Sequence, residues 1–408
     1  MSWNSQSNYN QNRHKLVAIK CGIDRLKIDS SKMDLHLHYG LITNESAVDD
    51  QGTPILKVLL DLEFKIKTIF SPEHGFKANG ADGSFQPHGQ HARLNIPIVS
   101  LYGDQLSPSE ESLKQLDALI LDLPNIGVRY YTYLWTMMHV METCVAYQKP
   151  LILLDRPNPL GGDLSMSEGP MMQPASLSFI GSWNVPIRFG LTLGELALLI
   201  KKEKGWHRLD LQIIPTAHWK RYMNCAQYQY PFVPPSPAIT DLDTIFTYPA
   251  LCYLEATNIS EGRGTEKSFK VAVAPWIHIQ SLISNLEKLD IKGLRFDESV
   301  LIAKGNKCNQ ETCFGAKLVV TDPNLFRPVY CGMILLAMIK SLFADQFRWM
   351  PYPTHVNRTG EDHFERLTGS TKLKHWLEHA PLENLDGLTP LLACEGWVHR
   401  CQSIMLYD

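Results

Sequence analysis

The sequence predicts an α/β protein with a Rossmann-like, mostly parallel sheet and helices on both faces, followed by a smaller α+β domain. The main observation is an alternation from about residue 33 to 214, where short apolar runs alternate with segments of helical periodicity. Such alternation implies crossover connections, which place helices over both faces of a parallel sheet. Beyond about residue 266 the pattern changes to mixed strands and helices. The length of 408 residues also favours two domains.

The elements of the first domain follow one another in a regular order. Strands are expected at the apolar runs Leu35–Ile42, Ile66–Phe70, Ile96–Leu101, Ala118–Asp122, Leu151–Asp155 and Leu211–Ile214. Helices are expected between them, where apolar residues recur at helical spacing, at Thr53–Leu62, Pro108–Leu116, Tyr131–Tyr147 and Thr192–Lys204. Pro108, directly behind Ser107, is a signal for the first turn of its helix.

The rest of the chain divides into a tail, a linker and the second domain. Residues 1–20 are expected to be a polar tail, of which residues 1–15 are mobile, and residues 21–265 to form the Rossmann-like catalytic domain. The proline-rich stretch Tyr230–Pro237 is a linker or a loop that lines a cleft, so the domain boundary falls within residues 230–265. Residues 266–408 are expected to form the auxiliary domain, with helices at Gly332–Phe343 and Thr371–Glu378.

The composition excludes several classes of function. The net charge is −3, from 39 basic and 42 acidic residues without long runs of either sign, which argues against a nucleic-acid surface. No apolar stretch is long enough to span a membrane, and the polar N-terminus lacks the apolar segment of a signal peptide. The nine cysteines are scattered and odd in number, which favours reduced thiols. We therefore expect a cytoplasmic protein.

The most informative segment is Ile66–Phe76, IKTIFSPEHGF. Pro72 cannot continue the strand, and Gly75 permits an unusual backbone angle two residues after Glu73. A carboxylate and the imidazole of His74 are thus expected side by side at the end of a parallel strand, where ligands bind in open α/β sheets. The alternative is a tight turn in which Glu73 caps a following helix and His74 is only solvated.

Further polar clusters follow other expected strand ends. The candidates for substrate binding are Asp122, Asn125, Arg129, Tyr130, Tyr133, Asp155, Arg156 and Asn158, with Asn258 and Arg263 of the later segment 255–265. That segment also carries Glu255 and Glu261, two carboxylates that are candidates for catalysis. For each arginine the alternative is an ion pair that braces a loop, and for the tyrosines it is burial in the core. Clusters at the edges of one sheet are expected to converge on one crevice.

The chemistry that suits these residues is glycoside hydrolysis, which generally uses two carboxyl groups. Aromatic rings commonly pack against the apolar faces of sugars, and arginine recognises carboxylates bidentately. A serine hydrolase is less attractive because the chain has no G-x-S-x-G motif. We expect no metal and no cofactor, since no convincing ligand set and no glycine-rich phosphate loop is present; the latter also argues against a nucleotide-dependent enzyme.

The ordered motifs FSPEHGF, PIVSLYG, GVRYYTY, LDRPNPLGG, SFIG, PPSP and LEATNISEGRGT resemble the bacterial exo-β-N-acetylmuramidase family. The resemblance runs from about Cys21 to the last helices. It implies a glycoside hydrolase that releases N-acetylmuramic acid from the non-reducing end of peptidoglycan fragments, with its active site in a cleft between a Rossmann-like domain and a smaller domain. It also implies a catalytic set of Glu73 as the leading acid, His74, Glu255 and Glu261. The lactyl carboxylate of the sugar gives Arg129, Arg156 or Arg263 a specific task.

The chain departs from the family pattern at several positions. Pro124-Asn125 stands where glutamine and aspartate are usual, Phe189 replaces a histidine, and Ala238 replaces an asparagine. The loop Asn79–Arg93 also lacks the usual aspartate and Thr-Gly pair. An alternative function is therefore a catalytically impaired protein that binds or senses muropeptides. The expected partners in both cases are peptidoglycan-derived saccharides, and the sequence does not indicate an oligomeric state.

Overall fold

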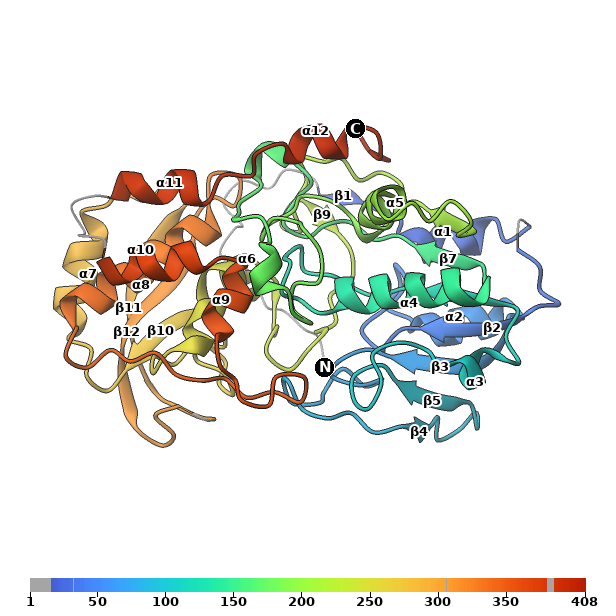
Figure 1. The fold of residues 1–408 in the computed structure, drawn as a ribbon, viewed down its shortest axis with the longest axis horizontal. Helices are drawn as coiled ribbons and strands as arrows, with labels where there is room; N and C mark the ends of the chain where they lie inside the picture. Colours follow the sequence, from blue (N-terminus) through green and yellow to red (C-terminus); the bar gives the residue numbers. More distant parts are fainter. Residues whose placement is uncertain (1–15, 32, 306, 380–384) are drawn as a thin grey trace.

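The computed structural model describes residues 16–31, 33–305, 307–379 and 385–408. The chain forms two lobes that lie side by side (Figure 1). The N-terminal lobe, in blue to green, contains the larger sheet, and the C-terminal lobe, in yellow to red, contains the smaller one.

The larger sheet has seven strands in the order β4-β5-β3-β2-β6-β7-β8. The strands are β2 (His38–Ile42), β3 (Lys65–Ser71), β4 (Gly89–Gln90), β5 (Pro97–Ser100), β6 (Ala118–Leu121), β7 (Leu151–Leu154) and β8 (Leu211–Ile214). All neighbours pair in parallel except β4 with β5. Without β4, this is the doubly wound Rossmann order, in which the strand order reverses between β2 and β6. The predicted Rossmann-like sheet and its six expected strands are confirmed.

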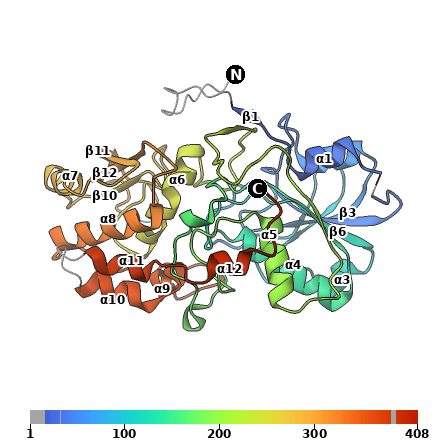
Figure 2. The same cartoon turned by 90° about the horizontal axis from the view of Figure 1, so that it is seen from above.

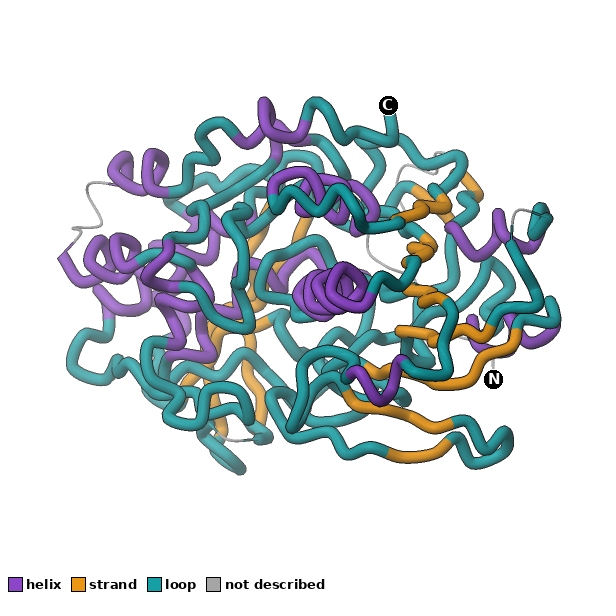
Figure 3. The backbone as a smooth tube through the Cα atoms, turned by 45° about the vertical axis from the view of Figure 1, so that its right-hand side comes forward, coloured by secondary structure: helices purple, strands orange, loops and turns teal. Residues whose placement is uncertain are grey.

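Helices cover both faces of this sheet, as predicted (Figure 3). Along β6 and β7, Ile120 and Ile152 share a core with α1 (Gly22–Ile28) and α2 (Ile55–Asp61). Their neighbours Leu121 and Leu153 share the other core with α4 (Tyr133–Tyr147) and α5 (Leu193–Glu203). Successive strand residues point to opposite faces, so fully apolar strands are what a doubly covered sheet requires.

Several boundaries differ from the predictions. The helix α3 (Glu110–Leu113) begins after Ser109, whose Oγ accepts a hydrogen bond from the Ser112 N–H, so the signal at Ser107-Pro108 was wrong by two positions. The expected polar tail at 1–20 overlaps β1 (Val17–Ala18), which pairs with β9 (Tyr228–Gln229), and Ile19 is buried. The expected mobile segment 1–15 lies outside the described residues.

The C-terminal lobe is built on an antiparallel sheet in the order β10-β12-β11. Its strands are β10 (Val271–Ala274), β11 (Leu294–Ile302) and β12 (Thr312–Val320). The helices that follow the first lobe are α6 (Leu242–Leu251), α7 (Ile279–Glu287), α8 (Pro328–Leu342), α9 (His363–Thr368), α10 (Thr371–His379), α11 (Leu388–Leu391) and α12 (Trp397–Cys401). Short 3-10 turns are η1 (Leu164–Met166), η2 (Pro174–Ser176), η3 (Cys252–Ala256) and η4 (Leu385–Gly387). The smaller α+β domain is thus confirmed.

The end of the chain returns to the N-terminal lobe. Helix α12 lies beside α5 in both cartoon views (Figures 1 and 2). The Trp397 indole N–H donates to the Phe189 carbonyl at 2.8 Å, and Arg400 forms an ion pair with Glu203. The Tyr407 hydroxyl donates to Asp155 at 2.6 Å. This return fastens the two lobes together on the side of α5.

Candidate active site

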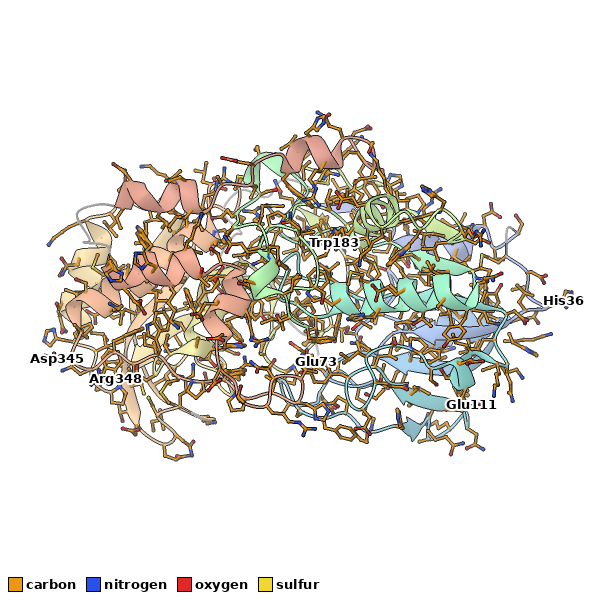
Figure 4. The ribbon with its side chains drawn as sticks, in the orientation of Figure 1. His36, Glu73, Glu111, Trp183, Asp345 and Arg348 are labelled. Carbon is orange, nitrogen blue, oxygen red and sulfur yellow. The ribbon has the colours of Figure 1, made fainter. Side chains whose placement is uncertain are left out.

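An open cavity of about 760 Å³ lies between the two lobes, at the carboxyl end of β3. The first lobe lines it with Glu73, His74, Asp82, Tyr102, Tyr130 and Thr132, and the second with Glu255, Arg263, Tyr352, His363 and Arg366. Figure 4 places Glu73 near the middle of the molecule, between the lobes. The cavity therefore combines side chains that are distant in the sequence.

Glu73 is positioned by the abrupt end of β3. The strand ends at Ser71, before Pro72. The two residues that follow Glu73, His74 and Gly75, have φ values of 69° and 72°. A left-handed conformation is strained for histidine but not for glycine, and such strain concentrates at functional sites. The alternative in which Glu73 caps a helix is wrong, because the described residues between β3 and β4 contain no helix and His74 is buried.

The Glu73 carboxyl group is buried and held by two neutral donors. The Gly83 N–H donates to Oε1 at 2.9 Å, and the Thr132 hydroxyl donates to Oε2 at 2.7 Å. Burial raises the pKa of Glu73, and the nearby Asp82 charge adds to this effect, while His74 opposes it. A carboxyl group with a raised pKa is suited to donate a proton.

The His74 side chain holds the loop that follows Glu73. Its Nδ1 lies 2.9 Å from the Gly80 carbonyl oxygen, which can only accept, so Nδ1 carries the hydrogen. This bond closes the loop that follows Glu73 and brings Asp82 back to the cavity. One ring nitrogen of His74 and one oxygen each of Glu73 and Asp82 lie within 4.8 Å of one another.

Asp82 is a second carboxylate of the cavity that the sequence analysis missed. The Tyr352 hydroxyl donates to its Oδ2 at 2.7 Å, and the Arg263 guanidinium lies 3.6 Å from the same oxygen. Burial raises the pKa of Asp82, but the charges of Arg263 and His74 outweigh it and hold this pKa below its ordinary value. The loop that carries Asp82 has no periodic pattern, so only its polar character marked it.

The second lobe contributes an ion-pair network. Arg263 pairs with Glu255 and with Glu261, and Lys307 pairs with Glu261 at 3.1 Å. His363 Nε2 lies 2.9 Å from the other oxygen of Glu255. Burial raises the pKa of Glu261, but Lys307 and Arg263 outweigh it and lower this pKa overall. Glu255 and Arg263 line the cavity, whereas Glu261 lies behind them.

The expected convergence of all clusters on one crevice is only partly correct. Asn125 and Arg156 line a second cavity of about 670 Å³, and Asp122 is fully buried and bound to Arg156. Arg156 binds Asp122 bidentately, with Nη2 to Oδ2 at 2.9 Å, and burial raises the pKa of Asp122 against the effect of Arg156. The alternative of a bracing ion pair is correct for this arginine. Asn125 Oδ1 accepts from the backbone N–H groups of Ile126 and Gly127, as in a local turn.

Asp155 and Asn158 also serve the first lobe rather than the cavity of Glu73. Asp155 accepts hydrogen bonds from the Thr192 hydroxyl at 2.6 Å and from the Gly194 N–H at 2.9 Å, and burial raises its pKa to about 6. Asn158 donates to the Leu191 carbonyl at 2.9 Å. Both side chains therefore hold the backbone at the start of α5.

Three more predicted substrate-binding residues lie outside the cavity. Arg129 is fully buried and donates to the carbonyls of Pro170, Val185, Leu367 and Thr368, which leaves no open face for a substrate. The Tyr133 hydroxyl donates to the Pro235 carbonyl at 2.6 Å within the core. Asn258 accepts from the Arg348 N–H and donates to the Gln346 carbonyl. Tyr130 does line the cavity, and its hydroxyl donates to the Pro249 carbonyl at 3.0 Å.

The remaining walls are suited to a ligand that is both apolar and polar. Tyr102, Phe179 and Tyr248 supply aromatic surface, and Ala238 stands on the wall formed by the proline-rich segment. Ser178 Oγ is buried at this wall and has no hydrogen-bond partner among the described residues. A buried hydroxyl without a partner carries a desolvation cost that a bound polar ligand would relieve.

Two groups of residues offer ligands for a cation. One is the Glu73, His74 and Asp82 group, and the other is Asp24, Asp49 and Asp50 near α1. In the second group Asp49 and Asp50 already pair with Lys20 and Lys27. All nine cysteines are free, and neither of the two ligand groups found among the described residues includes Cys308 or Cys313.

Tyr352, His363 and Arg366 were also missed by the sequence analysis. Tyr352 belongs to a loop whose aromatic residue and prolines, in the series Met350–Thr354, are a weak signal for a cleft wall. His363 and Arg366 lie on the short helix α9, which has no pattern that distinguishes a cavity wall from the surface.

No helix in the described part of the chain is long and apolar enough to cross a bilayer.

Comparison with known proteins gives consistent matches over most of the chain. Residues 39–243 match the N-terminal model, and residues 246–407 the C-terminal model, of the family described as exo-beta-N-acetylmuramidase NamZ. The peptidoglycan beta-N-acetylmuramidase NamZ of Bacillus subtilis (strain 168) is 34% identical over 373 residues, covering 91% of this chain and 87% of the relative.

Two crystal structures of DUF1343 family proteins from Bacteroides fragilis NCTC 9343 resemble this fold. The first has a TM-score of 0.85 at 26% identity and covers 96% of this chain and 100% of its own. The second has a TM-score of 0.74 at 25% identity and covers 96% and 99%.

Proposed function

The chain belongs to the exo-beta-N-acetylmuramidase NamZ family, and from this premise we propose that it is a glycosidase that releases N-acetylmuramic acid from the non-reducing end of peptidoglycan fragments, with Glu73 as its general acid. The observation that carries the assignment of Glu73 is its position. It is a buried carboxyl group at a strained strand end, and it faces the cavity between the lobes.

Protonation of the leaving oxygen is the step that Glu73 performs in this proposal. Its surroundings favour the neutral form, because burial outweighs the two hydrogen bonds that Gly83 and Thr132 donate. The same two bonds fix the orientation of the carboxyl group. Glu73 therefore holds a proton where a glycosidic oxygen enters the cavity, and its conjugate base takes a proton from the incoming water afterwards.

We assign recognition of the lactyl carboxylate to Arg366. The three arginines expected from the sequence are less suited to this contact. The Arg129 guanidinium donates to backbone carbonyls, Arg156 lies at the other cavity, and Arg263 already pairs with carboxylates. Arg366 lines the cavity and uses only its Nε, which donates to the Glu361 carbonyl at 3.3 Å. No carboxylate of the described residues pairs with it, so its outer nitrogens remain for a substrate anion.

Activity is tested with chromogenic β-glycosides of N-acetylmuramic acid and of N-acetylglucosamine, which differ in the lactyl group. We expect release of the chromophore from the first and little from the second. The Glu73→Gln variant should lose most of this activity, whereas Glu111→Gln, an exposed residue far from Glu73 in Figure 4, should retain it. Full activity of Glu73→Gln would remove Glu73 from the proposed role.

A muropeptide-binding protein without turnover remains the second candidate, because Ala238 lies on the cavity wall where the family pattern has asparagine. Asn125 gives this candidate less support, since it lies at the other cavity. Calorimetry separates the two functions: micromolar binding of N-acetylmuramic acid saccharides by the unmodified protein without any hydrolysis would favour the binding protein.

We place the boundary between the catalytic and the auxiliary domain within residues 230–265. The family models meet between residues 243 and 246, and α6 packs so closely on α8 that a Cβ at Gly332 would lie 2.2 Å from the Ala250 carbonyl oxygen. We also propose a reducing compartment, the cytoplasm, on the basis of the nine free cysteines. Cell fractionation tests this placement.

A further inference from the structure

The loop that carries Asp82 is fixed from both lobes. Gly83 donates its N–H to Glu73 and accepts a hydrogen bond from the His355 N–H at 2.7 Å. Gly83 has a φ of 62°, and a Cβ there would lie 2.6 Å from a Thr354 methyl carbon. Only glycine therefore fits at this contact, which sets the distance between Asp82 and Glu73.

The carboxylates of the second lobe are poor partners for Glu73. Both oxygens of Glu255 are occupied, one by Arg263 and the other by His363. Both oxygens of Glu261 are occupied as well, and this residue does not line the cavity. Each of them is neutralised by an adjacent cation, so their clearest task is to hold Arg263 in place.

Asp82 differs from them because one of its oxygens is open. Tyr352 and Arg263 engage Oδ2, whereas no described residue donates a hydrogen bond to Oδ1. The side chain is 31% exposed, and it lines the cavity. The guanidinium and the hydroxyl lower the pKa of Asp82, whereas burial raises that of Glu73, and two carboxyl groups whose pKa values are shifted in opposite directions are suited to act as anion and as acid.

The spacing between the two groups points to a particular stereochemistry. One oxygen of Glu73 and one of Asp82 lie within 4.8 Å of each other. Retaining glycosidases hold their carboxyl groups about 5–5.5 Å apart, whereas inverting enzymes need about 6.5–9.5 Å to admit a water molecule. The close approach of these two oxygens favours the shorter, retaining arrangement.

We propose that Asp82 is the catalytic nucleophile of a retaining double displacement, an inference that rests on the proposed function. Asp82 Oδ1 attacks the anomeric carbon, the bond to the leaving oxygen breaks, and that oxygen takes the proton of Glu73. Water then attacks the anomeric carbon of the resulting ester and gives a proton to Glu73. The bond to Asp82 breaks, which restores the aspartate and releases the sugar with its β configuration.

The test uses the β-fluoride of N-acetylmuramic acid, whose leaving group needs no acid. Glu73→Gln should form the ester with this substrate and hydrolyse it slowly, because the second step lacks its base. Mass spectrometry of the intact protein should then show the added sugar, and peptide analysis should place it on Asp82. Asp82→Asn should lose fluoride release by roughly 10³-fold or more, as when other catalytic nucleophiles are deleted.

A control variant and a chemical rescue accompany this test. Asp345→Asn, an exposed residue at the far end of the second lobe in Figure 4, should release fluoride at the unmodified rate. Asp82→Ala should recover fluoride release when azide is added and form the α-azide, a result that requires a folded protein. Inversion at the anomeric carbon, seen by early-time NMR, would overturn the proposal.

Two further results would also overturn it, and they separate its failure from that of the proposed function. Retention without an adduct, together with normal fluoride release by Asp82→Asn, would assign the nucleophile to the acetamido group of the substrate and leave the glycosidase activity intact. An unmodified protein inactive on every N-acetylmuramic acid glycoside would remove both the glycosidase function and the role of Asp82.

Discussion

Two carboxyl groups at the same edge of the large sheet have opposite surroundings. Glu73 follows β3 and Asp122 follows β6, and both are buried, with exposed fractions of 5% and 0%. Asp122 is bound bidentately by Arg156, whereas Glu73 accepts bonds only from a backbone N–H and a hydroxyl. The pair at Asp122 is electrically balanced, and the group at Glu73 is not.

This difference separates a structural ion pair, at Asp122, from a carboxyl group suited to chemistry, at Glu73. Burial raises the pKa of both residues, but a paired guanidinium opposes the change only at Asp122. Glu73 has no ion-pair partner among the described residues, its raised pKa favours the protonated form, and it faces a cavity shared by two lobes. The same motif, an acidic residue after an apolar strand, thus has two roles that only the neighbouring cation distinguishes.

The largest effect is expected when Glu73 is changed. Glu73→Gln keeps the size of the side chain but removes the proton donor, so kcat/KM for a disaccharide substrate should fall by roughly 10²–10⁴-fold. The thermal unfolding midpoint should stay close to that of the unmodified protein. A similar loss in Asp122→Asn at equal folding would erase the distinction between the two regions.

The next effect concerns stability rather than catalysis. Arg156→Met leaves Asp122 buried without its cation, which should lower the free energy of unfolding by about 3–5 kcal/mol. The double variant Arg156→Met/Asp122→Leu should recover most of that loss, since an apolar pair of similar volume is tolerated. Urea unfolding measures both. A large loss of kcat with unchanged stability would show that this pair acts in catalysis instead.

Arg366 provides a test of substrate recognition on the Glu73 side. Arg366→Met should raise KM for N-acetylmuramic acid glycosides by roughly 10–100-fold, the value of one charge-assisted bond of about 1.5–3 kcal/mol. The activity on N-acetylglucosamine glycosides, which lack the lactyl carboxylate, should not change. Equal effects on the two substrates would contradict a contact with that carboxylate.

A smaller effect is expected in the pH dependence of activity, which depends on the pKa values of Glu73 and Asp82. Glu73 must be protonated and its pKa is raised, so activity falls as pH rises through that value. Asp82 must be ionised and its pKa is lowered, so activity falls only at a low pH. Tyr352→Phe removes a hydrogen bond to ionised Asp82 and should move the acidic limb upward by about one pH unit, which corresponds to about 1.4 kcal/mol. An unmoved limb would exclude Asp82 from the titration.

The smallest effect is expected at Asn125. Asn125→Asp restores the residue of the family pattern at the cavity of Arg156, where it lies apart from Glu73. Its effect on kcat should stay within about twofold, as for changes of about 0.5 kcal/mol. A strong gain of activity would favour the impaired binding protein as the natural role of this chain.

The sequence predicted those parts of the fold that depend on regular burial. The alternation of apolar runs with helical segments identified the doubly covered sheet, and the strands around Leu121 and Leu153 are apolar on both faces, as such a sheet requires. The two-residue strands β1, β4 and β9 are too short to form a pattern. The start of α3 was missed because both Ser107 and Ser109 are residues that can cap a helix, and the structure uses Ser109.

The site was predictable only where the chain itself marks it. Pro72 and Gly75 bracket Glu73 within one turn, so this residue could be found. Asp82 and Tyr352 are joined by a hydrogen bond across 270 positions, and neither belongs to a periodic segment. Arg129 carried the same local signal as a substrate-binding arginine, but its side chain points to backbone carbonyls, a direction that the sequence does not encode.

The most direct test of the central claim is the dependence of the Glu73→Gln defect on the leaving group. Glycosides of N-acetylmuramic acid with leaving groups of increasing basicity are compared by kcat/KM, which reports the first chemical step. We expect almost no defect for fluoride, which needs no proton, and a defect of roughly 10²–10⁴-fold for a sugar leaving group. A defect of the same size for every leaving group would contradict the role of Glu73 as the proton donor.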